Sequence, residues 1–277
     1  MRHTVPLQTG LEPFPGYRLR RLLGYGSFAE VWEAEAADGT LCALKFLPAE
    51  REQATPSELR SLQAIRQLLH PNLLRIDRVW CHLGYIVIAM ERADGTLADL
   101  NATSRTETGC VIIPEHACLL LSQAAAALDF LNARQHHVEG KTVSIQHCDV
   151  KPSNLMLFGE TVKLADFGLA ALMSGPVVPH RPSGTPEYAA PEVFRGRLSR
   201  FSDQFALAVS YCELRGGRLP FDPPPRTFHP DYFHPPPNLS MLSAVERPIV
   251  ARALAIAAEE RWPSCVEFID RVARLFL

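Results

Sequence analysis

The sequence lacks a long apolar run, a signal-peptide core and an excess of charge of either sign. No apolar run reaches about 18 residues, the minimum for a membrane-spanning helix, and the first residues carry no apolar core of a secretory signal. The formal net charge is −2, so the chain has no global basic field that would attract nucleic acid. We therefore expect no membrane span in this chain and no nucleic-acid partner.

The cysteines form no recognisable framework. The seven cysteines are odd in number and scattered, and none belongs to a C-x-x-C pair. A disulfide framework or a zinc site would need even numbers or close spacing. The pattern fits a reducing compartment, and we expect a cytoplasmic protein or the cytoplasmic module of a longer one.

The composition is that of an ordinary globular protein. The chain has 277 residues, of which 47% are hydrophobic and 21% charged. This length suits one large domain or two lobes around a cleft. Residues 1–16 contain three prolines and little periodicity, which predicts an N-terminal tail.

Residues 17–92 are rich in short extended runs. The Asp38-Gly39 pair stands between two of them, a strong hairpin signal. Ser57 and Glu58 follow Thr55-Pro56 in a capping-box pattern with proline at the first helical position, which predicts one helix. We expect a small lobe of about five strands and one helix.

Beyond about residue 115 the apolar periodicity becomes helical. Helices are predicted over 116–134 and 202–214, and two further capping boxes begin at Ser243 and Ser264. Residues 219–237 are too rich in proline for a helix and predict an irregular surface segment. Residues 136–143 predict a lengthened loop.

A glycine-containing turn and a lysine stand in the first strands. Gly24 and Gly26 can bring backbone N–H groups close to phosphate oxygens, although, taken alone, the two glycines favour a plain tight hairpin. Lys45 ends an apolar strand, where it could snorkel from an edge or clamp a phosphate. A second strand follows the glycines, which disfavours the dinucleotide-binding alternative, because that pattern requires a helix.

Two acidic residues stand in a setting that predicts phosphoryl chemistry. Asp149 and Asp166 are 17 positions apart, with Asn154 between them. One carboxylate can take a proton from an attacking hydroxyl. The other, with the amide oxygen of Asn154, can hold Mg²⁺ against a polyphosphate.

Taken together in sequence order, these motifs resemble the catalytic domain of protein serine/threonine kinases of the kind common in bacteria. The resemblance extends from about Tyr17 to Leu277 and rests on the following pattern: Gly24/Gly26/Val31, Ala43-x-Lys45, Glu58, His147-x-Asp149-x-Lys151-x-x-Asn154, Asp166-Phe167-Gly168 and Ala190-Pro191-Glu192. It implies an α+β, bilobal protein-kinase-like fold over 17–277, with a small five-stranded antiparallel lobe (17–92) carrying one helix and a larger, mainly helical lobe (93–277).

The resemblance also implies a role for each matching residue. Asp149 would orient and deprotonate the substrate hydroxyl, and Lys151 would steady the γ-phosphoryl group. Asn154 and Asp166 would hold Mg²⁺. Lys45 would pair with the phosphates of ATP and with Glu58. The remaining nucleotide-binding residues would be Gly24, Gly26, Val31, Ala43, Met90, Glu91, Ala93 and Met156.

Further structural roles are implied. His147 would pack with Phe167 in a spine that also includes Leu62 and Ile76, anchored by Asp203. Glu192 would form an ion pair with Arg261, and residues 184–192 would dock a peptide substrate. Lys151, two residues after the catalytic aspartate, favours serine and threonine over tyrosine.

Two positions depart from the family pattern. Ala29 replaces the third glycine of the phosphate loop. Cys148 replaces the arginine that normally precedes the catalytic aspartate and receives the activation-loop phosphate. A neutral thiol cannot make that charge-assisted bond, so we expect catalysis that does not depend on activation-loop phosphorylation. Glu58 could also cap its own helix instead of reaching Lys45.

The expected function is transfer of the γ-phosphoryl group of Mg-ATP to a serine or threonine of a protein substrate. The alternative is a pseudokinase that acts as a nucleotide-binding signalling scaffold. A small-molecule phosphotransferase is a third candidate, disfavoured by the docking segment 184–192. The sequence names neither the physiological substrate nor the oligomeric state.

Overall fold

The computed structural model describes residues 6–25, 29–48, 66–82, 84–107, 109–138 and 140–277. Its contacts divide the chain into two compact units. The smaller unit comprises Met1–Leu69 and Leu74–Asp94, and the larger comprises His70–Leu73 and Gly95–Leu277. The sequence placed the lobe boundary at 92–93, and the contacts divide the chain at 94–95.

The smaller unit is built on a five-stranded antiparallel sheet with the order β1-β2-β3-β5-β4. Its strands are β1 (Tyr17–Tyr25), β2 (Glu30–Ala36), β3 (Leu41–Pro48), β4 (Ile76–His82) and β5 (Tyr85–Glu91). Asp38 and Gly39 form the predicted β2–β3 turn, in which Gly39 has a φ of 82°. An L-side chain rarely adopts that conformation, and the Asp38 carboxylate accepts the N–H of Thr40 at 2.9 Å. The predicted five strands are confirmed; the predicted helix at Ser57 lies outside the described residues.

One face of this sheet carries a core that includes the buried residues Leu19, Trp32, Leu44, Phe46 and Val87. Successive side chains of a strand point to opposite faces of the sheet, and the residues of this core on β2, β3 and β5 are either two positions apart on one strand, as Leu44 and Phe46 are, or register partners on neighbouring strands, as Trp32 and Leu44 are. Part of the stretch 1–16, which the sequence predicted to be a tail, packs against this core. Leu7 and Leu11 contact it, and the backbone of Leu19 exchanges hydrogen bonds with Gly10 and Leu11.

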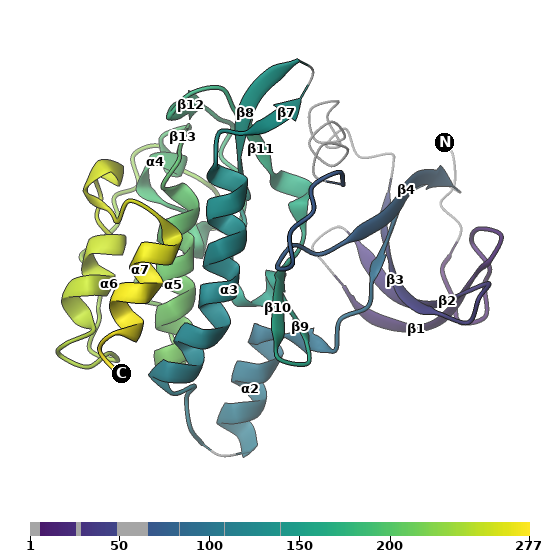
Figure 1. Cartoon of the computed structure of the whole chain (residues 1–277), viewed down its shortest axis with the longest axis horizontal. Helices are drawn as coiled ribbons and strands as arrows, with labels where there is room; N and C mark the ends of the chain where they lie inside the picture. The colour runs from purple at the N-terminus through teal and green to yellow at the C-terminus, as the bar shows by residue number, and fades with distance from the viewer. Residues whose placement is uncertain (1–5, 26–28, 49–65, 83, 108, 139) are drawn as a thin grey trace. The chain divides into compact units, whose positions relative to one another are not determined.

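The larger unit is mainly helical, and its central helices α3, α5 and α7 lie side by side (Figure 1). Its helices are α2 (Leu97–Glu107), α3 (Pro114–Asn132), α4 (Pro191–Phe194), α5 (Ser202–Gly216), α6 (Arg247–Ala253) and α7 (Cys265–Ala273). The predicted cap at Ser264 is confirmed, because its hydroxyl accepts the N–H of Glu267 at 3.0 Å. At Ser243 the capping contact also forms, with the Glu246 carboxylate accepting the Ser243 N–H, and α6 begins one residue after Glu246.

Three small sheets lie beside these helices. They are formed by β6 (Gly95–Thr96), β9 (Leu155–Phe158) and β10 (Thr161–Leu164); by β7 (His136–Val138), β8 (Lys141–Gln146) and β11 (Ala171–Met173); and by β12 (Val177–Pro179) with β13 (Arg197–Ser199). The 3₁₀ turns are η1 (Pro152–Asn154), η2 (Phe167–Leu169), η3 (Pro186–Tyr188) and η4 (Ala258–Glu260).

The prediction of a loop over 136–143 is wrong, because β7 and β8 pair as a hairpin in this stretch. Gly140 has a φ of 74° there, a conformation suited to a hairpin turn. The interpretation as a loop overlooked the extended preference of the valines and threonine on either side.

The proline-rich stretch 219–237 is irregular, as predicted. It is fastened to the large unit by aromatic contacts: the ring of Phe221 stacks on Phe205, with centroids 5.7 Å apart, and Tyr232 lies 4.8 Å from Phe194. His234 is buried between these rings.

The core of the large unit lies mainly along α3 and α5. The buried face of α3 includes four alanines, Ala117, Ala124, Ala125 and Ala127, and small side chains let neighbouring helices approach closely.

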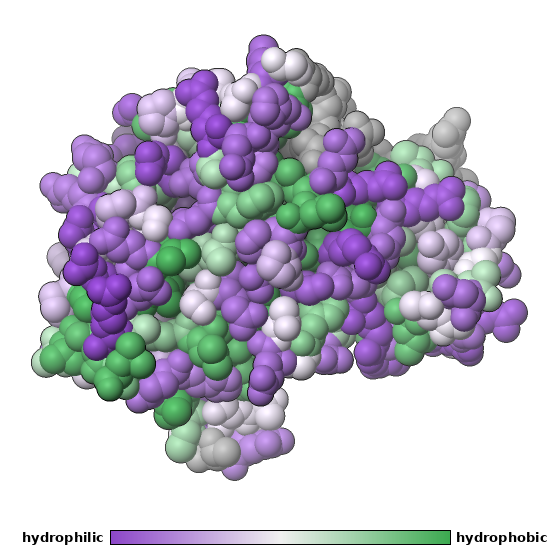
Figure 2. All heavy atoms as spheres, viewed as in Figure 1, coloured by the Kyte–Doolittle hydropathy of each residue, from purple (hydrophilic) through white to green (hydrophobic). Residues whose placement is uncertain are grey.

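In the space-filling view, apolar side chains gather near the C-terminal end of the chain (Figure 2), where Leu275 and Leu277 are exposed. No helix in the described residues is both long and apolar enough to cross a membrane.

Candidate active site

The loop that carries Asp149 connects β8 to β9 and is fixed by a buried carboxylate. Asp203, in the first turn of α5, is 5% exposed and accepts the backbone N–H groups of His147 at 2.6 Å and Cys148 at 2.9 Å. Cys148 has a φ of 68°, an unfavourable conformation for a non-glycine residue that surrounding contacts must hold. The implied anchoring role of Asp203 matches these contacts.

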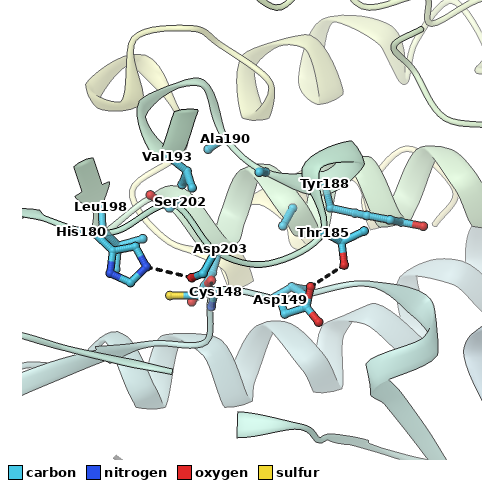
Figure 3. Close-up of a pocket in the computed structure, with 14 residues that line it drawn as sticks. Cys148, Asp149, His180, Thr185, Tyr188, Ala190, Val193, Leu198, Ser202 and Asp203 are labelled. Carbon is cyan, nitrogen blue, oxygen red and sulfur yellow. Dashed lines mark hydrogen bonds between the residues drawn. The ribbon is translucent and has the colours of Figure 1, made fainter. Parts of the chain in front are cut away.

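Three side chains fix the carboxylate of Asp149. Thr185 Oγ1 donates to Oδ1 at 2.7 Å (Figure 3), and Asn154 Nδ2 donates to Oδ2 at 2.9 Å. Lys151 Nζ lies 2.9 Å from Oδ2 and 2.6 Å from Thr185 Oγ1. Lys151 and Asn154 lie just before and within η1, and Thr185 lies just before η3, so residues 36 positions apart are brought together. A carboxylate held in this way can orient a hydroxyl and accept its proton.

Asn154 and Asp166 are neighbours through their backbones. The carbonyl oxygen of Asn154 accepts the N–H of Ala165, the residue before Asp166, at 2.9 Å. The amide nitrogen of Asn154 donates to the backbone oxygen and the carboxylate of Asp149, so Oδ1 is the atom of this side chain that could ligate a metal ion. One amide oxygen and one carboxylate suit Mg²⁺, which fills its remaining positions with water and phosphate oxygens, so the residues fit the ion.

His147 is a packed core residue, as predicted. It is 0% exposed, its Nε2 lies 2.8 Å from the carbonyl oxygen of Ala165, and its ring meets Phe167 edge to face with centroids 5.1 Å apart. Its Nδ1 accepts the N–H of Asp149 at 3.3 Å. The histidine therefore joins the loop of Asp149 to the strand end before Asp166. Of the other predicted spine residues, Ile76 lies on β4 of the smaller unit and Leu62 is outside the described residues.

Six of the predicted nucleotide-binding residues lie on the five-stranded sheet of the smaller unit: Gly24, Val31, Ala43, Lys45, Met90 and Glu91. Register pairs Val31 on β2 with Lys45 on β3, and Ala43 on β3 with Met90 on β5. The remaining positions are distributed as follows: Gly24 on β1, Glu91 at the end of β5, Ala93 just beyond it, and Met156 on β9 of the larger unit. Gly26 and Glu58 lie outside the described residues, and so does the predicted contact between Lys45 and Glu58.

The segment between Gly168 and Glu192 is held by backbone pairing. β12 pairs antiparallel with β13, and backbone bonds from His180 to Gly196 and from Arg200 to Pro176 extend the ladder. His180 also lies 3.0 Å from the hydroxyl of Ser183 at the edge of a small pocket beside Cys148 (Figure 3). Burial raises the pKa of the Cys148 thiol well above its usual range, so this position carries no charge toward the segment.

The predicted ion pair between Glu192 and Arg261 is present. Arg261 Nη1 and Nη2 each lie 2.8 Å from a carboxylate oxygen of Glu192, and the arginine side chain is fully buried. Burial raises the pKa of Glu192, but the charge and hydrogen bonds of Arg261 outweigh that effect, so the pKa lies below its ordinary value. This pair fastens the end of the predicted docking segment, residues 184–192, to the stretch between η4 and α7.

Two contacts at the site were not predicted. Tyr188 in the docking segment donates to Glu213 of α5 at 2.5 Å, and Gln146 is fully buried beside Asp203. The sequence offered one signal for the burial of Gln146: a polar residue directly follows the strand-like run Val143-Ser144-Ile145. No sequence pattern indicated its partners, since they lie on other elements.

Comparison with known proteins identifies the family. The model of the protein kinase domain matches residues 17–232. CBL-interacting protein kinase 4 of Oryza sativa subsp. japonica is 37% identical over 226 residues, which are 76% of this chain and 47% of that protein. CBL-interacting serine/threonine-protein kinase 7 of Arabidopsis thaliana is 34% identical over 219 residues, 74% of this chain and 47% of its own. The chain thus spans about half the length of these curated relatives.

A solved structure extends the similarity to the whole fold. The kinase domain of PknI from Mycobacterium tuberculosis, in a point-mutant form, superposes with a TM-score of 0.75 at 27% identity, covering 99% of this chain and 100% of that one. The expected protein-kinase fold is therefore confirmed. With the family model matching most of its length, the chain belongs to the protein kinase family, as a serine/threonine kinase catalytic domain.

Proposed function

We propose that this chain transfers the γ-phosphoryl group of Mg-ATP to a serine or threonine hydroxyl of a protein. The observation that carries the proposal is the arrangement around Asp149, whose carboxylate is held by Lys151, Asn154 and Thr185 within 2.9 Å. These side chains could accept a proton and position a phosphate group. The relatives of the chain are named as protein kinases.

The residues of the larger unit would divide the work between positioning and charge. Asp149 would orient the substrate hydroxyl and accept its proton, and Lys151 would neutralise charge on the transferring group. Asn154 and Asp166 would hold Mg²⁺, which, when bound, bridges phosphate oxygens and offsets their charge. In such a reaction positioning and electrostatics supply nearly all of the catalysis.

The residues of the smaller unit would bind the nucleotide. Lys45 would hold the α- and β-phosphates, with Glu58 as its partner, and the backbone around Gly24 and Gly26 would cover the phosphates. Val31 and Ala43, together with Met156 of the larger unit, would enclose the adenine base, and Met90 with residues 91–93 would form the segment that hydrogen-bonds it. The shared register of Val31, Lys45, Ala43 and Met90 supports this proposal.

The compartment and the partners are proposals of the same kind. All seven cysteines are free, which fits a reducing environment. We place the reaction in the cytoplasm, where Mg-ATP is available, with a serine- or threonine-bearing protein as the substrate.

The pseudokinase alternative predicts nucleotide binding or scaffolding without transfer. A pseudokinase typically lacks at least one of the residues that carry phosphoryl transfer. This chain retains all four of them: Lys45, Asp149, Asn154 and Asp166. The contacts of Asp149 with Asn154 and Lys151 favour an active enzyme over a scaffold.

Asp166→Asn and Lys45→Met test the proposed function. Because Asp166 would be the charged ligand of Mg²⁺ and Lys45 the clamp on the phosphates, each change should lower kcat/KM for ATP by about 10²-fold or more. Steady-state kinetics with a generic basic protein substrate gives the values, and thermal melting shows whether the variants fold. Wild-type kcat/KM in both variants would contradict the proposed roles.

Activity should not depend on a phosphate in the activation segment. Cys148 offers no cation to receive one, and β12–β13 pairing already holds the segment. We expect Ser174→Ala and Ser183→Ala, singly and together, to keep activity within about 3-fold of wild type, because the described side chains that hold the Asp149 carboxylate are Lys151, Asn154 and Thr185. Kinase assays of protein treated with phosphatase would measure this. A large loss from either change would contradict the prediction.

Thr185→Ala should behave differently in the same series. Thr185 donates to Asp149 and accepts from Lys151, so its loss should lower kcat through misplacement of both groups. This effect would not report on phosphorylation, and Thr185 therefore serves as the comparison for Ser174 and Ser183.

A further inference from the structure

Glu33 is a buried acidic residue of the five-stranded sheet, and two arginines share its carboxylate. It lies on β2 and is 8% exposed. Arg21 of β1 donates to it twice, from Nε to Oε1 and from Nη2 to Oε2, at 3.2 Å each. Arg92, which follows the last residue of β5, donates from Nε to Oε2 at 2.6 Å. One carboxylate therefore joins the edge strand β1 to the chain directly after β5.

Glu33 stands on the face of the sheet that carries predicted nucleotide-binding residues. Register pairs Glu33 with Ala43, and Ala43 with Met90, so these side chains form one row across β2, β3 and β5. Val31 and Lys45 lie two positions from Glu33 and Ala43 along their strands and share that face. The apolar core of the sheet occupies the opposite face. The carboxylate thus lies beside the residues proposed to enclose the base.

Residues 91–93, the segment proposed to hydrogen-bond adenine, are held through two neighbouring side chains. Oε1 of Glu91 accepts the backbone N–H of Arg75 at 2.7 Å, and the N–H of Glu91 donates to the carbonyl oxygen of Arg75 at 3.3 Å. The guanidinium of Arg92 is bonded to Glu33. Successive side chains of an extended chain point in opposite directions, so these two contacts fix the backbone of the segment from both sides.

The charges around Glu33 suit a firm anchor. The hydrogen bond from Arg21 is the largest influence on the pKa of Glu33 and, together with that from Arg92, it outweighs the effect of burial, so the pKa lies below its ordinary value. The carboxylate is therefore ionised at neutral pH, and a hydrogen bond between charged groups is stronger than one between neutral groups. Loss of this charge would leave the guanidinium of Arg92 with the longer contact, 3.9 Å, to the exposed carboxylate of Asp94.

We propose that Glu33 is a positioning residue for nucleotide binding: through Arg92 it holds the backbone of residues 91–93 in the orientation that hydrogen-bonds adenine. This inference rests on the proposed function, which assigns that segment to the base. A backbone that is already in place costs less free energy to order when the ligand binds. The pair therefore raises the affinity for the base and leaves the rate of phosphoryl transfer unchanged.

The test compares Glu33→Gln with Glu35→Gln. Glu35 is the matched control, because it stands two positions further along β2 and forms its ion pair with Arg20 of β1 rather than with Arg92. In Glu33→Gln the Kd for adenosine should rise about 10-fold, the size expected when one charge-assisted hydrogen bond no longer holds the binding group. Glu35→Gln should bind adenosine as wild type does. Titration calorimetry measures both, and melting temperatures show that the variants fold.

Two further readouts separate positioning from a general structural role. Mg-tripolyphosphate, which has no base, should bind Glu33→Gln as it binds wild type. KM for ATP should rise while kcat stays within about 2-fold of wild type, the pattern of a lost interaction that contributes equally to the ground state and the transition state. Wild-type affinity for adenosine in Glu33→Gln would overturn the proposal, and so would an equal loss of tripolyphosphate affinity or an equal effect of Glu35→Gln.

Arg92→Met keeps the test decisive if Glu33→Gln fails to fold. The side chain of Arg92 is more exposed, at 29%, and its replacement should raise the Kd for adenosine by a similar factor. The double variant should lose about as much affinity as either single change, because both remove the same contact. Additive losses, or wild-type adenosine binding in Arg92→Met, would contradict the role of the pair.

Transfer assays distinguish failure of this inference from failure of the proposed function. Adenosine binding that depends on Glu33 in a protein that transfers no phosphate would refute the proposed transfer and support the role of Glu33. Phosphate transfer with unchanged nucleotide affinity in Glu33→Gln would refute the inference alone. A wild-type protein that binds no adenosine would overturn the inference as well.

Discussion

Asp149→Asn is expected to lower the rate of phosphoryl transfer by about 10²–10⁴-fold, the usual contribution of a general base. Asparagine has nearly the same shape and can still accept from Thr185, but it cannot take a proton from the substrate hydroxyl. The affinity for ATP should stay near that of wild type, since Asp149 would touch the hydroxyl and not the nucleotide. Quenched transfer assays and equilibrium binding of a fluorescent ATP analogue measure the two effects.

The control for this variant is Asp231→Asn. Asp231 is a surface aspartate in the proline-rich segment, and its side chain is 87% exposed. Its replacement removes the same charge and should leave both transfer and binding unchanged. Transfer at the wild-type rate by Asp149→Asn would show that another group is the base.

Arg261→Met is expected to cause the largest loss of stability. Arg261 is fully buried and pairs with Glu192 through two bonds of 2.8 Å. Methionine fills similar space but leaves a largely buried carboxylate without its cation, which typically costs about 3–5 kcal/mol. For a chain of this size the melting temperature should fall by about 10 °C. Calorimetry or circular dichroism without nucleotide measures the change.

The matched control is Arg271→Met on α7. Arg271 pairs with Glu267 one helical turn away at 3.1 Å, and its side chain is 49% exposed. Exposed pairs of this kind contribute about 0.3–0.5 kcal/mol, so the melting temperature should hardly change. An equal fall in melting temperature in both variants would contradict the larger contribution to stability expected of the buried pair.

The pH dependence of stability gives the same pair a second readout. The pKa of Glu192 is lowered in the folded state from its ordinary value of 4.5. Its contribution to stability is therefore present above that ordinary value and is lost as pH falls through the lowered, folded-state pKa. In Arg261→Met this acid-dependent loss should largely disappear.

Local signals in the sequence predicted local structure well. Asp38-Gly39 predicted its hairpin because the turn conformation depends on glycine itself, and Ser264 predicted a helix start because its cap reaches only as far as Glu267. The hairpin over 136–146 was missed, since its strands are short and two histidines obscure the alternation. The two unpredicted contacts, of Gln146 and Tyr188, lie between different elements.

The catalytic set could be predicted only because the motif order resembles a known family. No spacing rule shows that Thr185 contacts Asp149, which lies 36 positions away, or that Asp203 holds the backbone of His147. These contacts arise from packing of α5 and η3 against the loop after β8. The same holds for Gln146, whose partners Asn132 and Asp203 come from α3 and α5.

The most direct test of the account is transfer of labelled γ-phosphate from ATP to a generic basic protein by the wild-type chain, with and without Mg²⁺. We predict incorporation that requires Mg²⁺ and appears, after acid hydrolysis, as phosphoserine or phosphothreonine. Nucleotide binding without any incorporation would contradict the account and identify a scaffold, and labelled phosphotyrosine would contradict the assigned specificity.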